Sequence, residues 1–134
     1  MRACRKGKKW DATPLLESLF QKHKEEAAFL FVYIQEAHPA DGWQMEPNTT
    51  DGVIFNQPRE WSEPQGVAQA CCSKLNLSIP CVVDRSDNSG DNLYAAWPER
   101  IFVIDRQGRI AYAGKQGPWG FKPEEAERAL KRLR

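Results

Sequence analysis

The sequence A-A-F-L-F-V-Y-I, from Ala27 to Ile34, is a continuous apolar run rich in aromatic and β-branched residues. It is too short for an ordinary helix, whereas strands buried on both faces of a parallel sheet have this length and composition. We therefore interpret it as a central strand. The fold class then depends on the segments that flank it.

The segment before this strand predicts a helix from Thr13 to about Lys24. Thr13 is expected to cap the helix and Pro14 to occupy its first position, where the missing N–H of proline costs no hydrogen bond. His23 stands among lysines and is therefore expected at the surface. The apolar residues that recur at helical spacing along one side are Leu15, Leu16, Leu19 and Phe20.

The segments after the strand alternate between irregular and regular structure. Residues 45–61 are expected to form a long surface connection, and residues 63–75 a second helix. Residues 79–84, I-P-C-V-V-D, predict another short buried strand. A polar loop over 85–92 and a helical turn around 93–96 should follow it.

The C-terminal third predicts a hairpin and a helix. Residues 100–105 and 109–114 are typical of two strands, with Gly108 at the left-handed position of the turn between them. The last helix is predicted to begin at Pro123, with acidic residues in its first turn and cations at its end. Its inward-facing residues are expected to be Ala126, Ala129, Leu130 and Leu133.

This order of elements, helix, strand, helix, strand, hairpin and helix, predicts an α/β fold of the thioredoxin-like sandwich type. Such a fold normally opens with a strand before the first helix. Residues 1–12 are too basic and too poor in apolar residues to provide one, so we expect this first strand to be missing. We divide the chain into a basic N-terminal segment, 1–12, and one thioredoxin-like domain, 13–134.

The composition indicates one soluble globular domain, because 41% of the 134 residues are hydrophobic and 28% are charged. The formal net charge is only +1, so no overall field favours nucleic acid or an anionic membrane as a partner. No apolar run reaches the roughly 20 residues that span a bilayer, and we expect a cytoplasmic protein. The four cysteines lack the spacing of a zinc site, so no metal is expected.

Ligands of open α/β sheets gather at the carboxyl ends of the parallel strands. Four polar loops should meet at that edge here: those after the two parallel strands, the one before the hairpin and the one after it. The side chains that they bring to this rim are His38, Asp41, Trp43, Asp84, Arg85, Trp97 and Trp119. Aromatic walls with a few polar groups suit a small aromatic ligand.

Two residues of the first loop can handle protons. His38 can donate or relay a proton near neutral pH, and Glu36 can orient or charge its ring. Each has a purely structural alternative, His38 as a loop histidine bonded to backbone and Glu36 as a solvated carboxylate. The tryptophans of the rim have one as well, since they can simply cover the edge of the core.

Four stretches of the chain resemble the iodothyronine deiodinase family, in the same order. They are Y-I-Q-E-A-H-P-A-D-G-W at 33–43, C-V-V-D at 81–84, Y-A-A-W-P-E-R at 94–100 and G-R-I-A-Y-A-G-K-Q-G-P-W at 108–119. The resemblance covers roughly residues 14–134. P-R-E-W at 58–61 and C-C-S-K-L-N-L at 71–77 are more similar to bacterial members than to the vertebrate enzymes.

The resemblance implies an activity of the thyroxine 5'-deiodinase type, in which a selenol or thiol removes iodide reductively from an aromatic ring. A thiol cosubstrate, such as thioredoxin or glutathione, is implied as the reductant, and no other cofactor. By position, Glu36 and His38 match the family's proton-handling residues, and Pro98 matches a proline that is usually cis. The residues expected around the substrate are Trp43, Arg85, Trp97, Pro98 and Trp119.

The catalytic loop of the family is the main departure. The family places selenocysteine or cysteine in a G-S-x-T-(U/C)-P-P-F loop before the first helix, and that position falls near Lys6. Residues 1–10 do not resemble this motif, although Cys4 lies two residues away. Cys4 is either a displaced nucleophile, whose thiolate the nearby cations favour, or an exposed thiol of the tail. Asn56 and Gln57 stand where a second family histidine would fall.

Two functional interpretations follow. The first is a thiol-based reductase of deiodinase type, acting on an iodothyronine or a related halogenated aromatic. The second is a truncated or non-catalytic thioredoxin-like binding domain, with peroxide or disulfide reduction as a further alternative, because the fold alone does not choose among these chemistries. The feature that distinguishes these two interpretations is residues 1–12, where the catalytic loop of the family falls. A homodimer is among the assemblies that the sequence leaves open. Cys71, Cys72 and Cys81 are expected to be packing residues.

Overall fold

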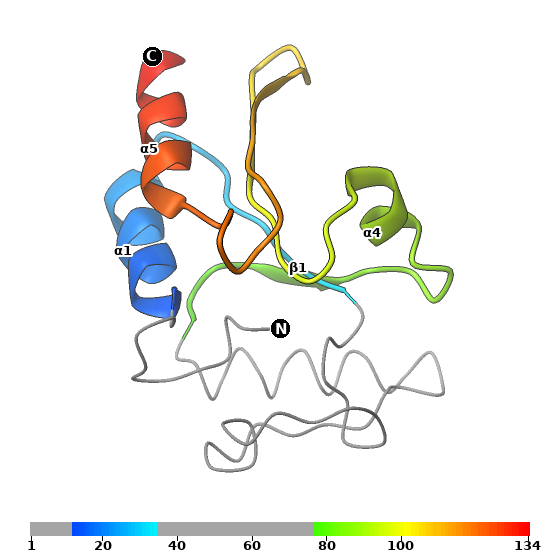
Figure 1. Ribbon diagram of the computed structural model, residues 1–134. Helices are drawn as coiled ribbons and strands as arrows, with labels where there is room; N and C mark the ends of the chain where they lie inside the picture. The colour runs from blue at the N-terminus through cyan, green and yellow to red at the C-terminus, as the bar shows by residue number, and fades with distance from the viewer. Residues whose placement is uncertain (1–11, 35–76) are drawn as a thin grey trace.

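The computed structural model describes residues 12–34 and 77–134 (Figure 1). The elements of these residues are α1 (Thr13–His23), β1 (Phe31–Tyr33), β2 (Cys81–Val83), α4 (Ser89–Tyr94), β3 (Phe102–Ile104), β4 (Ile110–Ala113) and α5 (Pro123–Arg132). The described part is thus a mixed α/β structure, as the sequence predicts. The predicted connection over 45–61, the second helix over 63–75 and almost all of the basic segment lie outside the described residues.

The predicted central strand pairs in parallel with the strand of the I-P-C-V-V-D segment. In this register Phe31 lies opposite Cys81 and Tyr33 opposite Val83. The backbone N–H of Phe31 donates to the carbonyl of Pro80 at 2.8 Å, which closes one end of the pair. Both strands are shorter than their apolar runs. Parallel pairing between distant segments is therefore confirmed, within a two-stranded sheet of the described residues.

The hairpin forms a second two-stranded sheet, with β3 antiparallel to β4. Its turn is held by Asp105, whose carboxylate accepts the backbone N–H groups of Gln107 and Arg109, each at 2.9 Å. Gly108 has a φ of +78°, the left-handed conformation that the sequence predicts there. The register shifts between Val103 and Ile104, so the hairpin carries an irregularity beside its turn.

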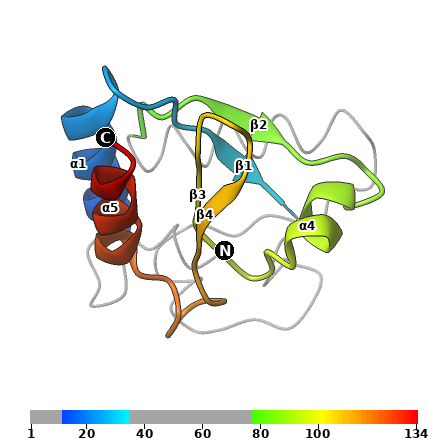
Figure 2. The ribbon, with the colours of Figure 1, turned by 90° about the horizontal axis from the view of Figure 1, so that it is seen from above.

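The first and last helices, α1 and α5, lie side by side in both ribbon views, on the flank opposite α4 (Figures 1 and 2). The buried apolar residues lie on α1 and α5 and around β1 and β2. They are Leu16, Leu19, Tyr33, Ile34, Ile79, Ala126 and Ala129. The helix predicted from Pro123 is confirmed at its first residue, with acidic residues in its first turn and basic ones in its last. Leu133 was expected inward and is 40% exposed, because the helix ends one residue before it.

His23 is buried, and the prediction that it lies at the surface is wrong. Its Nε2 lies 3.1 Å from Glu127 Oε1 on α5, and its Nδ1 lies 3.3 Å from Glu26 Oε2 and 2.8 Å from Arg134 Nη2. Arg134 also forms an ion pair with Glu26. We call these four residues the α1–α5 clasp. The neighbouring lysines of His23 misled the prediction, because they remain at the surface while the imidazole turns toward α5.

Glu127 is the acidic centre of the α1–α5 clasp. Hydrogen bonds from Lys22, then from Lys131 and His23, hold the pKa of its carboxyl well below its usual range. The same bond raises the pKa of Lys22. A carboxyl with a lowered folded-state pKa adds stability that is present above its unfolded-state pKa and is lost as the pH falls toward the folded-state value.

We therefore expect Glu127→Gln to destabilise the fold most near neutral pH. Because the glutamate has an ordinary pKa of 4.5 when unpaired, the difference from the wild type should shrink as the pH falls below that value. Urea unfolding of both proteins near neutral pH and at about pH 3 measures this difference. A difference in unfolding free energy between the two proteins that does not depend on pH would contradict this role of Glu127.

The start of α1 also differs from its prediction. The backbone N–H of Leu16 donates to the carbonyl of Ala12 at 2.9 Å, so Ala12 is the N-cap and Thr13 already belongs to the helix. Pro14 therefore takes the second helical position. None of the helices in the two described ranges has the length and apolar character needed to cross a membrane.

Candidate active site

The carboxylate of Asp84 organises the loop after β2. It accepts the backbone N–H groups of Arg85, Gly90 and Asp91, at 2.8, 2.9 and 2.8 Å. These bonds hold the first turn of α4, which begins at Ser89 rather than near residue 93 as predicted. The prediction placed the start of α4 too late in the sequence. The start depends on the carboxylate at the end of β2, and the apolar pattern of the loop gives no sign of it.

The next link runs from α4 to the loop before the hairpin. Asp91 is buried, and its Oδ1 accepts the backbone N–H of Trp97 at 2.8 Å. Ala95 has a φ of +47° and ends the helix, and the N–H of Ala96 donates to the backbone carbonyl of Asp91 at 3.1 Å. The chain therefore turns sharply between the end of α4 and Trp97.

Two cis peptide bonds lie at this end of the hairpin, Trp97–Pro98 before β3 and Gly117–Pro118 after β4. The first agrees with what the family resemblance implies for Pro98. Gln116 joins the two segments, because its Nε2 donates to the carbonyl of Trp97 at 2.7 Å and to that of Ala95 at 3.2 Å. The loops before β3 and after β4 therefore meet, as the topology predicts.

Arg100 fixes the same junction from its other side. Its Nε donates to the carbonyl of Gly114 at 2.5 Å, and its Nη1 donates to the carbonyls of Tyr94 and Ala95 at 2.8 and 3.4 Å. The guanidinium also lies over the ring of Phe102, 5.0 Å from the centroid. Sequence reasoning assigned no role to Arg100 or Gln116. Their position in the quoted motifs was the only signal, and their partners are set by tertiary structure.

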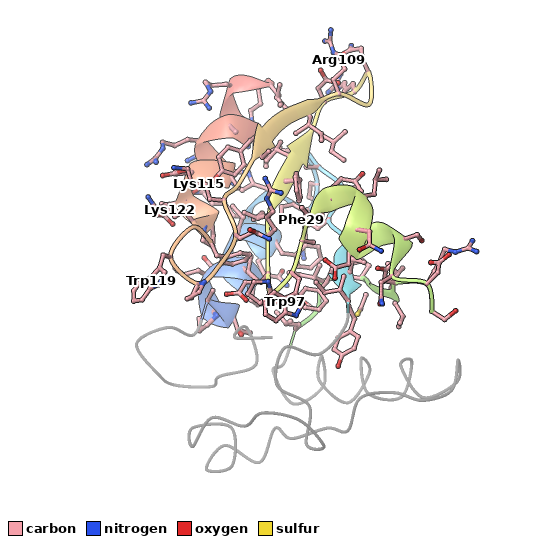
Figure 3. All side chains as sticks on the ribbon, turned by 45° about the vertical axis from the view of Figure 1, so that its right-hand side comes forward. Phe29, Trp97, Arg109, Lys115, Trp119 and Lys122 are labelled. Carbon is pink, nitrogen blue, oxygen red and sulfur yellow. The ribbon has the colours of Figure 1, made fainter. Side chains whose placement is uncertain are left out.

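The predicted substrate residues Trp97 and Trp119 remain accessible. Trp97 is 44% exposed and Trp119 is 72% exposed. Figure 3 shows both toward the same end of the described residues, far from Arg109 at the hairpin tip. Pro98 lies between the backbone that Asp91 and Gln116 hold and the start of β3. The backbone of Trp97 is thus held on both sides while the residue stays exposed.

Arg85 is placed differently. Its Nε lies 3.4 Å from Asp87 Oδ2 in the same loop, and its side chain is 75% exposed. Hydrogen bonds from Ser89, with a smaller contribution from the charge of Arg85, lower the pKa of Asp87. Arg85 thus lies at the carboxyl end of β2, paired within its own loop. Five predicted site residues lie outside the described residues: Cys4, Glu36, His38, Asp41 and Trp43.

Residues 77–134 contain two exposed tryptophans, Trp97 and Trp119, and one cysteine, Cys81. Cys81, on β2, is half-buried, and its Sγ donates to the carbonyl of Val82 at 3.8 Å. The indoles of Trp97 and Trp119 offer flat apolar faces, and the loops around them are held by backbone hydrogen bonds. Flat apolar faces of this kind suit an aromatic ligand, while proton transfer and attack on such a ligand require other groups.

Comparison with known proteins identifies the family to which the chain belongs. The sequence profile of iodothyronine deiodinases matches residues 12–134, so the chain belongs to the iodothyronine deiodinase family. It is 38% identical over 99 residues to type I iodothyronine deiodinase of Xenopus laevis, which is 74% of this chain and 37% of that protein. It is 31% identical over 121 residues to type II iodothyronine deiodinase of Homo sapiens, 89% of this chain and 44% of that protein.

The bovine type II enzyme gives the same result, with 31% identity over 121 residues, 89% of this chain and 45% of the relative. The chain therefore spans about two fifths of the length of the curated relatives that it matches. The matched region includes every described helix and strand and the whole of the Trp97–Pro98 and Gly114–Gly120 segments.

Proposed function

We propose that this chain is a deiodinase-type oxidoreductase domain that removes iodide reductively from an iodothyronine or a related halogenated aromatic compound. In the net reaction a ring C–I bond becomes C–H, two thiols are oxidised to one disulfide, and iodide and a proton are released. The family match over residues 12–134 carries this proposal. The exposed indoles on a fixed backbone support it, since they suit a flat aromatic substrate.

The roles of the residues follow from the same proposal. Trp43, Trp97 and Trp119 would form the aromatic walls, with Pro98 next to Trp97 and Arg85 at their edge. Glu36 and His38 would move protons, and Cys4 is the candidate nucleophile. We further propose a thioredoxin-like sandwich as the complete fold. A thiol reductant such as thioredoxin or glutathione would act in a reducing compartment such as the cytoplasm.

The test is thiol-dependent release of iodide from an iodothyronine by the whole 134-residue chain. Wild type is compared with Cys4→Ser and His38→Ala, and with Cys81→Ser as the matched thiol control. We expect release by the wild type, at least a tenfold loss in His38→Ala, as for a general acid or base, and little change in Cys81→Ser. Loss in Cys4→Ser would identify Cys4 as the nucleophile.

A second possible outcome would count against the proposal. A chain that is folded by circular dichroism and releases no iodide would contradict the proposal and favour a non-catalytic binding domain. Equilibrium binding of the same iodothyronine, followed by quenching of tryptophan fluorescence, would then show whether the aromatic wall retains a ligand.

A further inference from the structure

We propose that Asp84 and Asp91 are positioning residues, which together fix the Trp97–Pro98 segment as the aromatic wall of the substrate site. The inference rests on the proposed function, because it assigns Trp97 to substrate binding. Neither aspartate is placed in contact with substrate. Their effect is transmitted through α4, from the carboxyl end of β2 to the backbone of Trp97.

The first step of this connection is the bond set of Asp84. One carboxylate oxygen accepts the N–H groups of Arg85 and Gly90, and the other accepts the N–H of Asp91. Charge-assisted bonds of this kind are stronger and more directional than neutral ones. Gly90 makes the close approach possible, because a Cβ at this position would lie 2.6 Å from Asp84 Oδ1.

The second step is the buried carboxylate of Asp91. Only 4% of this residue is exposed, and burying a carboxylate is costly unless donors satisfy it. One of its donors is the backbone N–H of Trp97, at 2.8 Å. Because Asp84 binds the N–H of Asp91 while Asp91 binds the N–H of Trp97, the strand end and the loop before the hairpin are coupled through two carboxylates.

The third step is that the backbone of Trp97 is held in place while the residue itself stays exposed. The N–H of Trp97 is held by Asp91, and its carbonyl is held by Gln116 at 2.7 Å. Both polar groups of its backbone are thus bound, while the residue stays 44% exposed. A tryptophan that only covered the core would bury its ring. A restrained backbone below an accessible indole is the arrangement that a binding wall requires, because it lowers the entropy lost when ligand binds.

The decisive variants are Asp91→Ala, which removes the acceptor for Trp97, and Asp91→Asn, which retains an oxygen at the same place. Asp87→Ala is the matched control, since Asp87 lies in the same loop and binds Ser89 and Arg85. In Asp91→Ala we expect KM for the iodothyronine to rise about tenfold and kcat to change by less than about twofold. Asp91→Asn should restore most of the affinity, and Asp87→Ala, which leaves the bonds of Asp84 and Asp91 in place, is the control for protection of the Trp97 amide.

Gly90→Ala tests Asp84 without removing its carboxylate. The added Cβ displaces Asp84 from the N–H groups of α4, so KM should rise as in Asp91→Ala, with kcat again preserved. Equal KM values in wild type, Asp91→Ala and Gly90→Ala would overturn the proposal. So would a loss in Asp91→Ala that Asp91→Asn does not relieve, because the bond to Trp97 would then not be its cause.

Hydrogen exchange of the Trp97 amide gives a readout that does not depend on turnover. We expect Asp91→Ala to accelerate this exchange at least about tenfold, while Asp91→Asn and Asp87→Ala retain the protection. If the wild type releases no iodide, the proposed function fails, and the exchange data still decide whether the aspartates fix this segment. Unchanged Trp97 exchange in Asp91→Ala would overturn the positioning role even in an active enzyme.

Discussion

Replacing His23 by alanine should lower the free energy of unfolding by about 3 kcal/mol, the sum of a cavity and lost buried hydrogen bonds. The imidazole is 1% exposed and meets Glu127 through Nε2 and both Glu26 and Arg134 through Nδ1. Its loss would leave Glu127 with Lys22 and Lys131 only, at the edge of a cavity between α1 and α5. Urea unfolding followed by circular dichroism measures the change.

The control is the neighbouring residue. Lys24 is exposed and its Nζ donates to Gln21 at 2.9 Å, so Lys24→Ala should cost less than about 0.5 kcal/mol. His23→Gln is informative as well, because an amide can donate to one carboxylate and accept from the guanidinium, which should recover part of the loss. If His23→Ala and Lys24→Ala were equally mild, the α1–α5 clasp would not stabilise the protein in solution.

The second large effect is expected for Arg100→Ala, which should cost about 2–4 kcal/mol of folding free energy. Three carbonyl groups, of Tyr94, Ala95 and Gly114, would lose a charged donor, and the ring of Phe102 would lose its guanidinium partner. Gly114 is buried, so its carbonyl has restricted access to water as a substitute.

Arg100→Lys should recover less than half of this loss, because an ammonium group lacks the planar fork that reaches carbonyls on two sides. Arg109→Ala is the matched control, since its side chain is 74% exposed and its ion pair with Asp105 is at the surface. Thermal and urea unfolding of the three variants make the comparison. A loss in Arg109→Ala as large as in Arg100→Ala would contradict the argument.

Local patterns predicted the elements well where the cause is local. The left-handed Gly108 and the start of α5 at Pro123 follow from nearby residues, and both are confirmed. The apolar run at 27–34 forms a strand only at Phe31–Tyr33, and Val32 is 43% exposed rather than buried. The failures share another cause. His23 is buried by a helix more than 100 residues away, and α4 is started by Asp84 from a strand end. A periodic pattern of apolar residues carries no information about contacts between residues so far apart in the sequence.

The candidate site was also predictable only in part. Topology predicted that the loops before and after the hairpin meet, and bonds from Gln116 to Ala95 and Trp97 show that they do. The identity of the residues that join them could not be predicted, because a polar side chain next to a strand end has many partners within reach. The roles of Trp97 and Trp119 in binding a substrate stay predictions.

The α1–α5 clasp also has a consequence for the order of events during translation. His23 and Glu127 are 104 positions apart, and His23 and Arg134 are 111 apart. At ribosomal rates of about 5–20 residues per second, α5 follows α1 by roughly 5–20 s. Throughout that interval His23 has Glu26 close in sequence but lacks Glu127 and Arg134. A chaperone that recognises α1 would bind it during this interval, before the two helices can pack together. A chain released during the same interval would lack α5.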